Sequence, residues 1–344
     1  MHSMTRRPPG KTLLLTLALL APVMAFADYS GNPRAAELKR ILADDYAFSG
    51  ADLAAVDQAL RKAERVPRLI EKEQTAKEKT LTWTGYRPIH VNDANVRRGV
   101  AFMNEYESWL ERAHREYGVA PAVIAAILGV ETKFGGYTGP HRVLDALSTQ
   151  GFEHPTRSDF FFSELVAFFV LCHEQQRQPE DMLGSYAGAM GAAQFMPSNY
   201  RRLAVDFDGD GDTDLWSLPD AIGSIANYLI KYRPQVAWQR DQPLIAPLRP
   251  TTGFRAPADA VNTKLPSETL GQLRESGAHI DAELDDATAA GILELKLDSG
   301  QHEYWAGLNN FYAVMSYNPR VYYAMSVTQL AEALSQARSE QAAR

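Results

Sequence analysis

A single glutamate closes an otherwise apolar stretch of the sequence. The stretch reads APAVIAAILGV, and Glu131 follows it directly. Ile124, Ile127 and Leu128 have the spacing of neighbours on one helix face, and Glu131 is the next member of the same series. We therefore expect a helix that ends at the glycine pair 135–136 and directs a carboxylate toward the protein interior.

Such a position suits a general acid. Burial disfavours the ionised form of a carboxylate and raises its pKa, so a glutamate on an apolar helix face can stay protonated near neutral pH. Cleavage of a glycosidic bond needs a group with that property. The alternative is a structural glutamate paired with an arginine or a backbone group. Asp145 and Asp159 are nearby in the sequence, but linear sequence does not place them as a second catalytic carboxylate.

The segment 206–220, DFDGDGDTDLWSLPD, has the spacing of a calcium-binding loop. Asp206, Asp208 and Asp210 occupy positions 1, 3 and 5 of an EF-hand pattern, and a glycine stands at position 6. Position 12, where the pattern requires glutamate, is Ser217. The next carboxylate is Asp220, which a loop stretched by three residues can bring to the metal.

The loop therefore predicts a structural Ca²⁺ site built from hard oxygen ligands. Clustered carboxylates repel one another without a cation, which argues against a simple solvated acidic turn. The expected ligands are the side chains of Asp206, Asp208, Asp210 and Asp220 and the backbone carbonyl of Asp212, with Asp214 or a water as a further ligand.

A glycine-rich segment, GSYAGAMGAAQFMPSNY, spans residues 184–200. It lacks the terminal Gly-Lys-Ser/Thr of a phosphate-binding loop, and no dinucleotide-binding glycine pattern follows a strand here. Small residues followed by Gln194, Phe195 and Met196 suit the wall of a groove in which the amide holds a polar substrate or a water. Close helix–helix packing through the glycines is the alternative interpretation.

The elements around these motifs are mainly helical. Residues 28–120 contain three stretches with helical spacing, and a segment with Trp83, Tyr86, Arg87 and Pro88 between them is expected to be a loop. Residues 121–240 are also mostly helical and carry the motifs described above. Residues 241–305 alternate apolar residues with prolines and glycines, which predicts short strands. The C-terminal segment 306–344 ends in a helix.

The N-terminal residues 1–27 have the pattern of a cleavable signal peptide. A basic start with Arg6, Arg7 and Lys11 precedes the apolar stretch TLLLTLALLAPVM and an Ala-Phe-Ala cleavage site. We expect cleavage after Ala27 and export to the periplasm. The residue directly after the expected cleavage site is Asp28 and not cysteine, so we expect no lipid anchor on a mature N-terminal cysteine.

Composition narrows the class of protein further. The chain has 344 residues, 45% of them hydrophobic, and a formal net charge of −7, which removal of the basic signal region would make more negative. An acidic chain of this kind gives no sign of nucleic-acid binding. The only cysteine, Cys172, lies in an apolar run, so no internal disulfide is expected and the thiol is predicted to be buried.

Taken in order, these motifs resemble the membrane-bound lytic murein transglycosylase B family. The resemblance rests on GVETKFGG, GSYAGAMGAAQFMPSNY, the extended calcium loop and NNFYAVMSYNPRVYYAMSV, and it covers about Tyr86 to about Leu334. It implies a mainly α (α+β) fold: a lysozyme-like α core in residues 121–240, an α region around it and a small β-containing insertion.

The resemblance also implies roles for individual residues. Glu131 matches the family's catalytic acid, and the aspartates named above match its calcium loop. The positions that match polar groups of the sugar-binding groove are Ser185, Gln194, Tyr317, Asn318 and Tyr323. The stretch HPTRSDFFF carries one arginine, Arg157, where two are expected. The expected partners are peptidoglycan strands and proteins of cell-wall synthesis or remodelling, and the enzyme is expected to be a monomer.

Family members cleave the β-1,4 bond between N-acetylmuramic acid and N-acetylglucosamine without water and form a 1,6-anhydro product. One carboxylate suffices for that reaction if the muramic C6 hydroxyl acts as the nucleophile. Three alternatives stay open at this point: a hydrolytic muramidase, a non-catalytic peptidoglycan-binding protein and a calcium-signalling protein. The single calcium loop, with no paired second loop, argues against the last.

Overall fold

The computed structural model describes residues 28–66, 68–69, 80–254, 256 and 259–343. The expected signal peptide, residues 1–27, lies outside the described residues. In chain order the elements are η1 Tyr29–Gly31, α1 Pro33–Tyr46, α2 Gly50–Lys62, α5 Trp83–His90, α6 Asp93–Glu105, α7 Glu107–Tyr117, α8 Pro121–Thr132, β1 His141–Arg142, α9 Val143–Glu153, α10 Ser158–Glu174, β2 Leu183–Gly184, α11 Pro197–Leu203, α12 Leu218–Lys231, η2 Pro234–Val236, β3 Ile245–Pro250, β4 Glu268–Thr269, α13 Leu270–Glu275, β5 Ala278–Ile280, β6 Ala289–Lys296, β7 His302–Leu308, α14 Asn309–Met315 and α15 Val321–Ala342.

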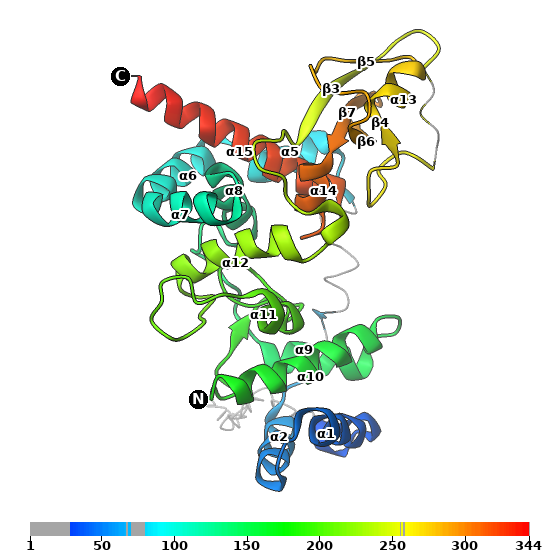
Figure 1. Cartoon of the computed structure of the whole chain (residues 1–344). Helices are drawn as coiled ribbons and strands as arrows, with labels where there is room; N and C mark the ends of the chain where they lie inside the picture. The colour runs from blue at the N-terminus through cyan, green and yellow to red at the C-terminus, as the bar shows by residue number, and fades with distance from the viewer. Residues whose placement is uncertain (1–27, 67, 70–79, 255, 257–258, 344) are drawn as a thin grey trace, which may run out of the picture.

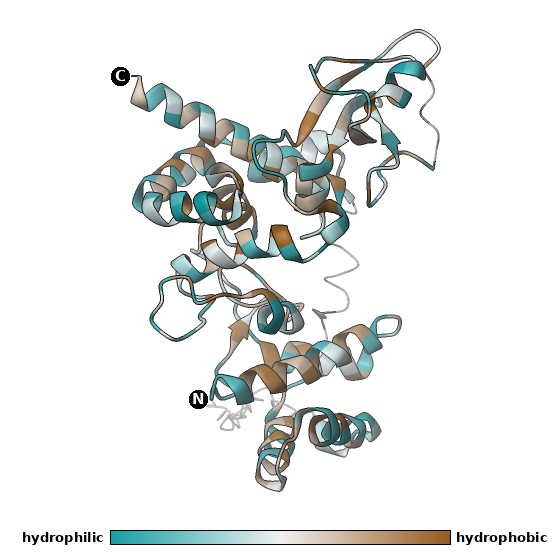
Figure 2. Ribbon diagram, viewed as in Figure 1, coloured by the Kyte–Doolittle hydropathy of each residue, from teal (hydrophilic) through white to brown (hydrophobic). Residues whose placement is uncertain are grey.

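The fold is mainly helical with a small antiparallel sheet, as the sequence predicts. The N-terminal pair α1 and α2 lies at one end of the molecule beside α9 and α10, and the sheet lies at the other end near the start of α15 (Figure 1). Both helices of the N-terminal pair carry hydrophilic and hydrophobic residues along their length (Figure 2). Their apolar residues, such as Leu38, Leu42 and Leu60, are buried.

Helix α8 runs through the main core. Every residue from Ala122 to Gly129 is buried, and the helix packs against α6, α7, α12 and α15. The prediction of a helix is confirmed, and burial extends beyond the face of Ile124, Ile127 and Leu128 to the other faces of the helix. Small residues such as Ala125 and Ala126 allow these helices to approach closely.

Helix α8 ends earlier than its glycines indicate. The last helical residue is Thr132, and Lys133 takes the left-handed conformation at φ 54°. The N–H of Phe134 donates to the carbonyl of Leu128 at 2.9 Å, and the N–H of Gly135 donates to the Thr132 hydroxyl at 3.0 Å. The side chain of Thr132 thus accepts a hydrogen bond from a backbone N–H of the turn. Lys133 takes the left-handed position that a glycine usually supplies after a helix.

The expected loop at Trp83–Pro88 is also wrong, because this segment forms helix α5. Trp83 and Tyr86 are buried, and their rings lie 5.6 and 5.8 Å from the ring of Tyr322 on α15. Tertiary packing of these aromatic rings stabilises a helix that contains Pro88. Local sequence alone favours a turn at such a proline.

The predicted strands form a five-stranded antiparallel sheet in the order β4-β6-β7-β3-β5. Strands β6 and β7 form a hairpin whose register pairs Ile292 with Ala306 and Lys296 with His302. The sheet has a small apolar core of its own, which includes Leu248, Leu270 and Ile292. The insertion also contains α13, which the alternating sequence pattern did not predict.

After the sheet the chain returns to the main core. Helix α14 follows β7 directly, and α15 packs along α8 and α6. This return brings Tyr317 and Tyr323 to the end of α8. No helix in the described part of the chain combines the length and apolar character needed to cross a membrane.

Candidate active site

The end of α8 opens onto a groove of about 390 Å³, called here the Glu131 groove. Its lining comes from α8, α9, α10, the glycine-rich segment and the loop between α14 and α15. The lining residues are Glu131, Gln150, Arg157, Phe160, Phe161, Ser185, Tyr186, Ala187, Ala189, Gln194, Met196, Tyr317, Asn318 and Pro319. Of the six groove residues expected from the sequence, five belong to this lining.

Glu131 is partly exposed and lines the groove, while residues 122–129 of the helix before it are buried. The sixth expected residue, Tyr323, lies behind it and donates its hydroxyl to Glu131 Oε1 at 2.6 Å. Burial, together with the negative charge of Glu131, raises the pKa of the Tyr323 phenol well above its ordinary value. The hydroxyl therefore remains protonated at neutral pH and acts as a donor to the carboxylate.

Tyr317 forms part of the groove floor. Its hydroxyl donates to the carbonyl of Ala193, and its ring lies 4.6 Å from that of Tyr228 and 5.8 Å from that of Phe195. Burial raises the pKa of Tyr317 as well. Of the two large apolar residues that the sequence suggested for the groove wall, Met196 lines the groove, whereas Phe195 is buried and absent from the lining.

The glycine-rich segment holds Gln194 and Ser185 in fixed orientations. Gln194 adopts the left-handed conformation and donates its amide Nε2 to the carbonyls of Thr138 and Gly191 at 3.0 and 2.9 Å. Both donor hydrogens are used, so its oxygen is the side of the amide suited to accept from a ligand. The Ser185 hydroxyl accepts from the N–H of Ala189 at 3.0 Å.

The glycines of this segment allow close approach, but not between two helices as the alternative interpretation expected, because residues 184–196 form turns and not a helix. A Cβ on Gly188 would lie 2.5 Å from a side-chain carbon of Leu147, and a Cβ on Gly191 would lie 2.4 Å from Cβ of Leu215. Both glycines have positive φ angles of 86° and 67°. The segment is therefore a groove wall that is also packed tightly against α9 and the acidic loop.

Sequence reasoning missed several groove residues. Gln150 on α9 and Phe160 on α10 line the groove beside the expected Arg157. The guanidinium carbon of Arg157 lies 4.8 Å from the centre of the Phe160 ring. The run of three phenylalanines after Arg157 could have indicated an aromatic wall, whereas Gln150 sits in a buried helix without a distinguishing signal.

The two other carboxylates considered from the sequence lie elsewhere. Asp145 is buried and receives bonds from Arg142 at 2.7 and 2.8 Å. Asp159 forms an ion pair with Arg34 at 3.0 Å, and its side chain is almost fully exposed. In the described part of the chain, Glu131 is the only acidic residue in the groove lining.

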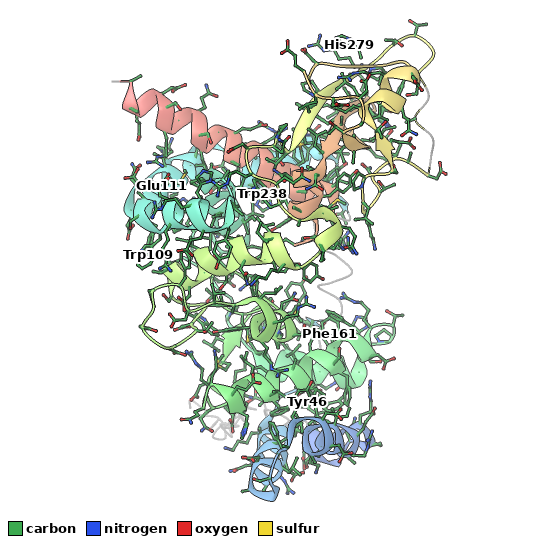
Figure 3. The ribbon with its side chains drawn as sticks, in the orientation of Figure 1. Tyr46, Trp109, Glu111, Phe161, Trp238 and His279 are labelled. Atoms are coloured by element: carbon green, nitrogen blue, oxygen red, sulfur yellow. The ribbon has the colours of Figure 1, made fainter. Side chains whose placement is uncertain are left out.

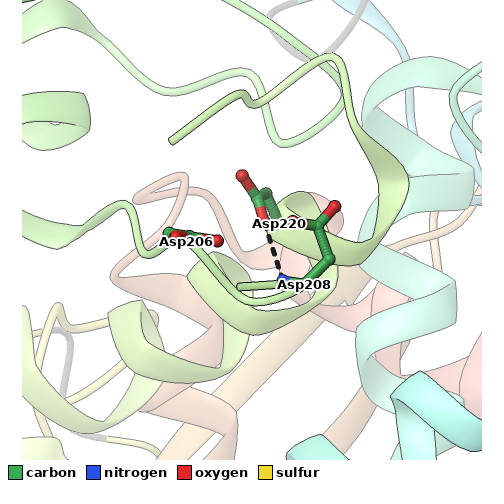
Figure 4. Close-up of side chains that lie close together, drawn as sticks. All are labelled: Asp206, Asp208 and Asp220. Carbon is green, nitrogen blue, oxygen red and sulfur yellow. Dashed lines mark hydrogen bonds between the residues drawn. The ribbon is translucent and has the colours of Figure 1, made fainter. Parts of the chain in front are cut away.

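The acidic loop brings Asp206, Asp208 and Asp220 together, with one carboxylate oxygen of each within 4.8 Å of the others (Figure 4). Asp220 is buried, and its Oδ1 accepts from the N–H of Phe207 at 2.6 Å. Burial raises the pKa of Asp220. A buried carboxylate beside two others fits a divalent cation with hard oxygen ligands.

The remaining aspartates of the loop have other partners. Asp210 accepts from the N–H of Asp212 at 2.8 Å and is outside the three-residue cluster. The carboxylate of Asp212 pairs with Arg177 at 2.9 Å and is outside the three-residue cluster as well. Asp214 lies 3.7 Å from the same arginine.

Comparison with known proteins identifies the class. The family model described as a transglycosylase SLT domain matches residues 34–332, and the chain belongs to this family of lytic transglycosylases. Membrane-bound lytic murein transglycosylase B of Escherichia coli (strain K12) is 36% identical over 318 residues, which are 90% of this chain and 85% of the relative.

Three solved structures resemble the fold closely. Catenated lytic transglycosylase SltB1 from Pseudomonas aeruginosa has a TM-score of 0.82 and 41% identity over 90% of this chain and 99% of that chain. The Escherichia coli lytic transglycosylase Slt35 in complex with calcium has a TM-score of 0.79 and 34% identity, with 91% and 96% covered. SltB3 from Pseudomonas aeruginosa in complex with NAG-anhNAM-pentapeptide has a TM-score of 0.71 and 28% identity, with 87% and 78% covered.

Proposed function

We propose that this chain cleaves the β-1,4 bond between N-acetylmuramic acid and N-acetylglucosamine in peptidoglycan without water and leaves a 1,6-anhydro end. The observation that carries the proposal is the groove in which Glu131 is the one carboxylate among the described lining residues. Ordinary glycosidases place two carboxylates across the sugar. The anhydromuramic ligand held by SltB3 is the kind of product that a single-carboxylate reaction gives.

In the first step Glu131 protonates the glycosidic oxygen as the bond to the muramic C1 breaks. Tyr323 donates to Oε1, so we assign the transferred proton to Oε2. Positive charge that develops at C1 is stabilised by the neighbouring N-acetyl group of the substrate. The N-acetylglucosamine part then leaves with a free 4-hydroxyl.

In the second step the ionised Glu131 takes the proton of the muramic C6 hydroxyl, and O6 forms the new bond to C1. The proton balance is restored, and no water enters the product. The hydrogen bond from Tyr323 stabilises the carboxylate between the two steps. Gln194 and Asn318 line the same groove and supply polar contacts that orient the sugars.

The acidic loop is proposed to hold Ca²⁺ for stability, with Asp206, Asp208 and Asp220 as side-chain ligands. The complex of Slt35 with calcium supports this assignment. The ion's role is to offset the repulsion of the clustered carboxylates and fix the start of α12. We also propose the periplasm, where peptidoglycan lies, as the place of action.

Mass spectrometry of the products from purified sacculi tests the proposed reaction. Muropeptides with anhydro ends, lighter by one water than the products of a hydrolytic muramidase, are expected. Products with reducing ends would support hydrolysis instead. Binding to sacculi without any release of fragments would support the non-catalytic alternative.

A further inference from the structure

Tyr137 lies on a segment that is fixed to the end of α8 and to the groove residue Gln194. Its N–H donates to the carbonyl of Thr132 at 2.9 Å, which ties it to the end of α8. The carbonyl of the next residue, Thr138, accepts from Gln194 at 3.0 Å. Gly139 then packs so closely that a Cβ there would lie 2.2 Å from the carbonyl oxygen of Gly184. The position of Tyr137 is therefore set by the groove wall itself.

The Tyr137 side chain is exposed although its backbone is held. It is 58% exposed, more than any other large hydrophobic side chain in the described part of the chain. The ammonium of Lys133 lies 5.9 Å from the ring centre, and the ring is absent from the groove lining and from the core contacts. An aromatic ring that folding leaves in water beside a binding groove indicates a contact made by the ligand.

We propose that Tyr137 is a stacking platform for a sugar ring of the glycan strand outside the Glu131 groove. The proposal rests on the proposed function, since it takes a polysaccharide as the ligand. A glycan strand of many sugars does not fit into a groove of about 390 Å³, so it must extend beyond the groove. The C–H face of a pyranose is apolar and slightly positive, and it suits the negative face of a tyrosine ring.

Phe160 is a second exposed aromatic residue at the Glu131 groove. It is 41% exposed and lines the groove. Tyr137 offers an exposed aromatic ring of the same kind outside the Glu131 groove. The positive charge of Lys133 beside the ring also favours a strand whose muramic units carry carboxylates.

Binding of purified glycan strands tests the proposal in a Glu131→Gln background, where cleavage does not interfere. The variants are Tyr137→Ala and Tyr137→Phe, with Tyr46→Ala as a control. Tyr46 is 38% exposed and lies in the N-terminal helix pair (Figure 3). Tyr137→Ala should weaken binding about 3- to 10-fold, the value expected for loss of one aromatic stacking contact. Tyr137→Phe and Tyr46→Ala should bind like the parent.

The same substitutions in the active enzyme separate the two proposals. Tyr137→Ala should raise KM for strands with little change in kcat and in melting temperature. Unchanged binding and KM in Tyr137→Ala would overturn the stacking role while the wild type still releases anhydro products. Equal losses in Tyr137→Ala and Tyr137→Phe would also overturn it, because the phenylalanine ring retains the stacking face. Failure of the wild type to release fragments would instead overturn the proposed function.

Discussion

The hydroxyl of Tyr323 donates to Oε1 of Glu131 across a separation of 192 residues in the sequence. The acceptor lies in the last turn of α8, and the donor lies near the start of α15. Between the two lie the glycine-rich segment, the acidic loop and the whole sheet. The packing of α15 on α8 therefore completes the candidate active site as well as the core.

Glu131→Gln should abolish turnover and leave folding and glycan binding intact. Glutamine has nearly the same shape but neither delivers a proton to the leaving oxygen nor takes one from the C6 hydroxyl. General acid–base catalysis contributes about 10²–10⁴-fold, and in the proposed mechanism one group serves both steps. Release of muropeptides measures turnover, and sedimentation with sacculi measures binding. Activity near that of the wild type would show that the role assigned to Glu131 is wrong.

Tyr323→Phe should lower kcat while KM and melting temperature change little. The variant removes a hydrogen bond to a carboxylate, a contact worth about 1.5–3 kcal/mol, so a loss of roughly 10- to 100-fold is expected. Tyr322→Phe is the matched control, because its hydroxyl accepts from the N–H of Lys296 and does not bond to Glu131. Equal rates for the two variants would contradict the positioning role of Tyr323.

Several elements could be predicted because apolar spacing depends mainly on neighbouring residues. The apolar run before Glu131 predicted α8, and the alternating residues around Asp298 and Gly300 predicted short strands, which form β6 and β7. The end of α8 could not be predicted in the same way, since Lys133 takes the left-handed conformation that glycine usually supplies. The bonds of the Thr132 hydroxyl that stabilise this turn appear only in three dimensions.

The sequence predicted those parts of the candidate site in which the residue type or its spacing differs clearly from the surrounding sequence. Glu131 stood out as a charge in an apolar run, and the acidic loop by its spacing. The family resemblance indicated Tyr323 as a groove residue, but nothing in the sequence singled it out as a partner of Glu131, because their contact depends on how distant helices pack. Helix α5 was missed for the same reason, since burial of Trp83 and Tyr86 outweighs the local preference of Pro88.

Calcium should raise the melting temperature, and Asp206→Asn should remove most of that effect. An ion that binds only the folded state at 100 times its Kd adds about 2.7 kcal/mol of stability. Asp206 belongs to the carboxylate cluster, whereas exposed Asp181 does not and serves as the control in Asp181→Asn. Thermal unfolding in calcium and then in chelator measures the shift. Equal shifts in both variants would argue against a metal at this cluster.

Gly191→Ala should destabilise the fold more than Gly300→Ala. Both glycines have positive φ, 67° and 77°, so alanine at either position carries a conformational penalty of about 1–2 kcal/mol. Only Gly191 adds overlap, because its Cβ would lie 2.4 Å from Cβ of Leu215, while Gly300 faces open space. Overpacking of this kind costs a further 1–3 kcal/mol, roughly. Denaturant unfolding measures both, and equal losses would contradict the close packing of the groove wall.

Glu164→Gln should flatten the pH dependence of stability above about pH 4.5. Glu164 is buried and accepts bonds from the N–H and hydroxyl of Ser198 at 2.9 and 2.6 Å. Burial outweighs these bonds and raises its pKa above the ordinary value of 4.5. The folded state therefore holds this proton more tightly than the unfolded state does. The resulting stability is fully present below pH 4.5 and is lost as the pH rises through the folded pKa.

The free energy of unfolding, measured from pH 4 to pH 7 in wild type and variant, tests this sign. The wild type should lose stability relative to Glu164→Gln as the pH rises, in addition to a pH-independent offset of about 1 kcal/mol from the altered bonds to Ser198. Glu174→Gln is the control, because Glu174 pairs with Arg201 at the surface and its loss removes a charge without removing a buried carboxyl group. A constant difference between wild type and Glu164→Gln across this range would mean that Glu164 does not titrate with a raised pKa in the folded protein. A difference that grows in the opposite direction would mean that the bonds from Ser198 outweigh the effect of burial.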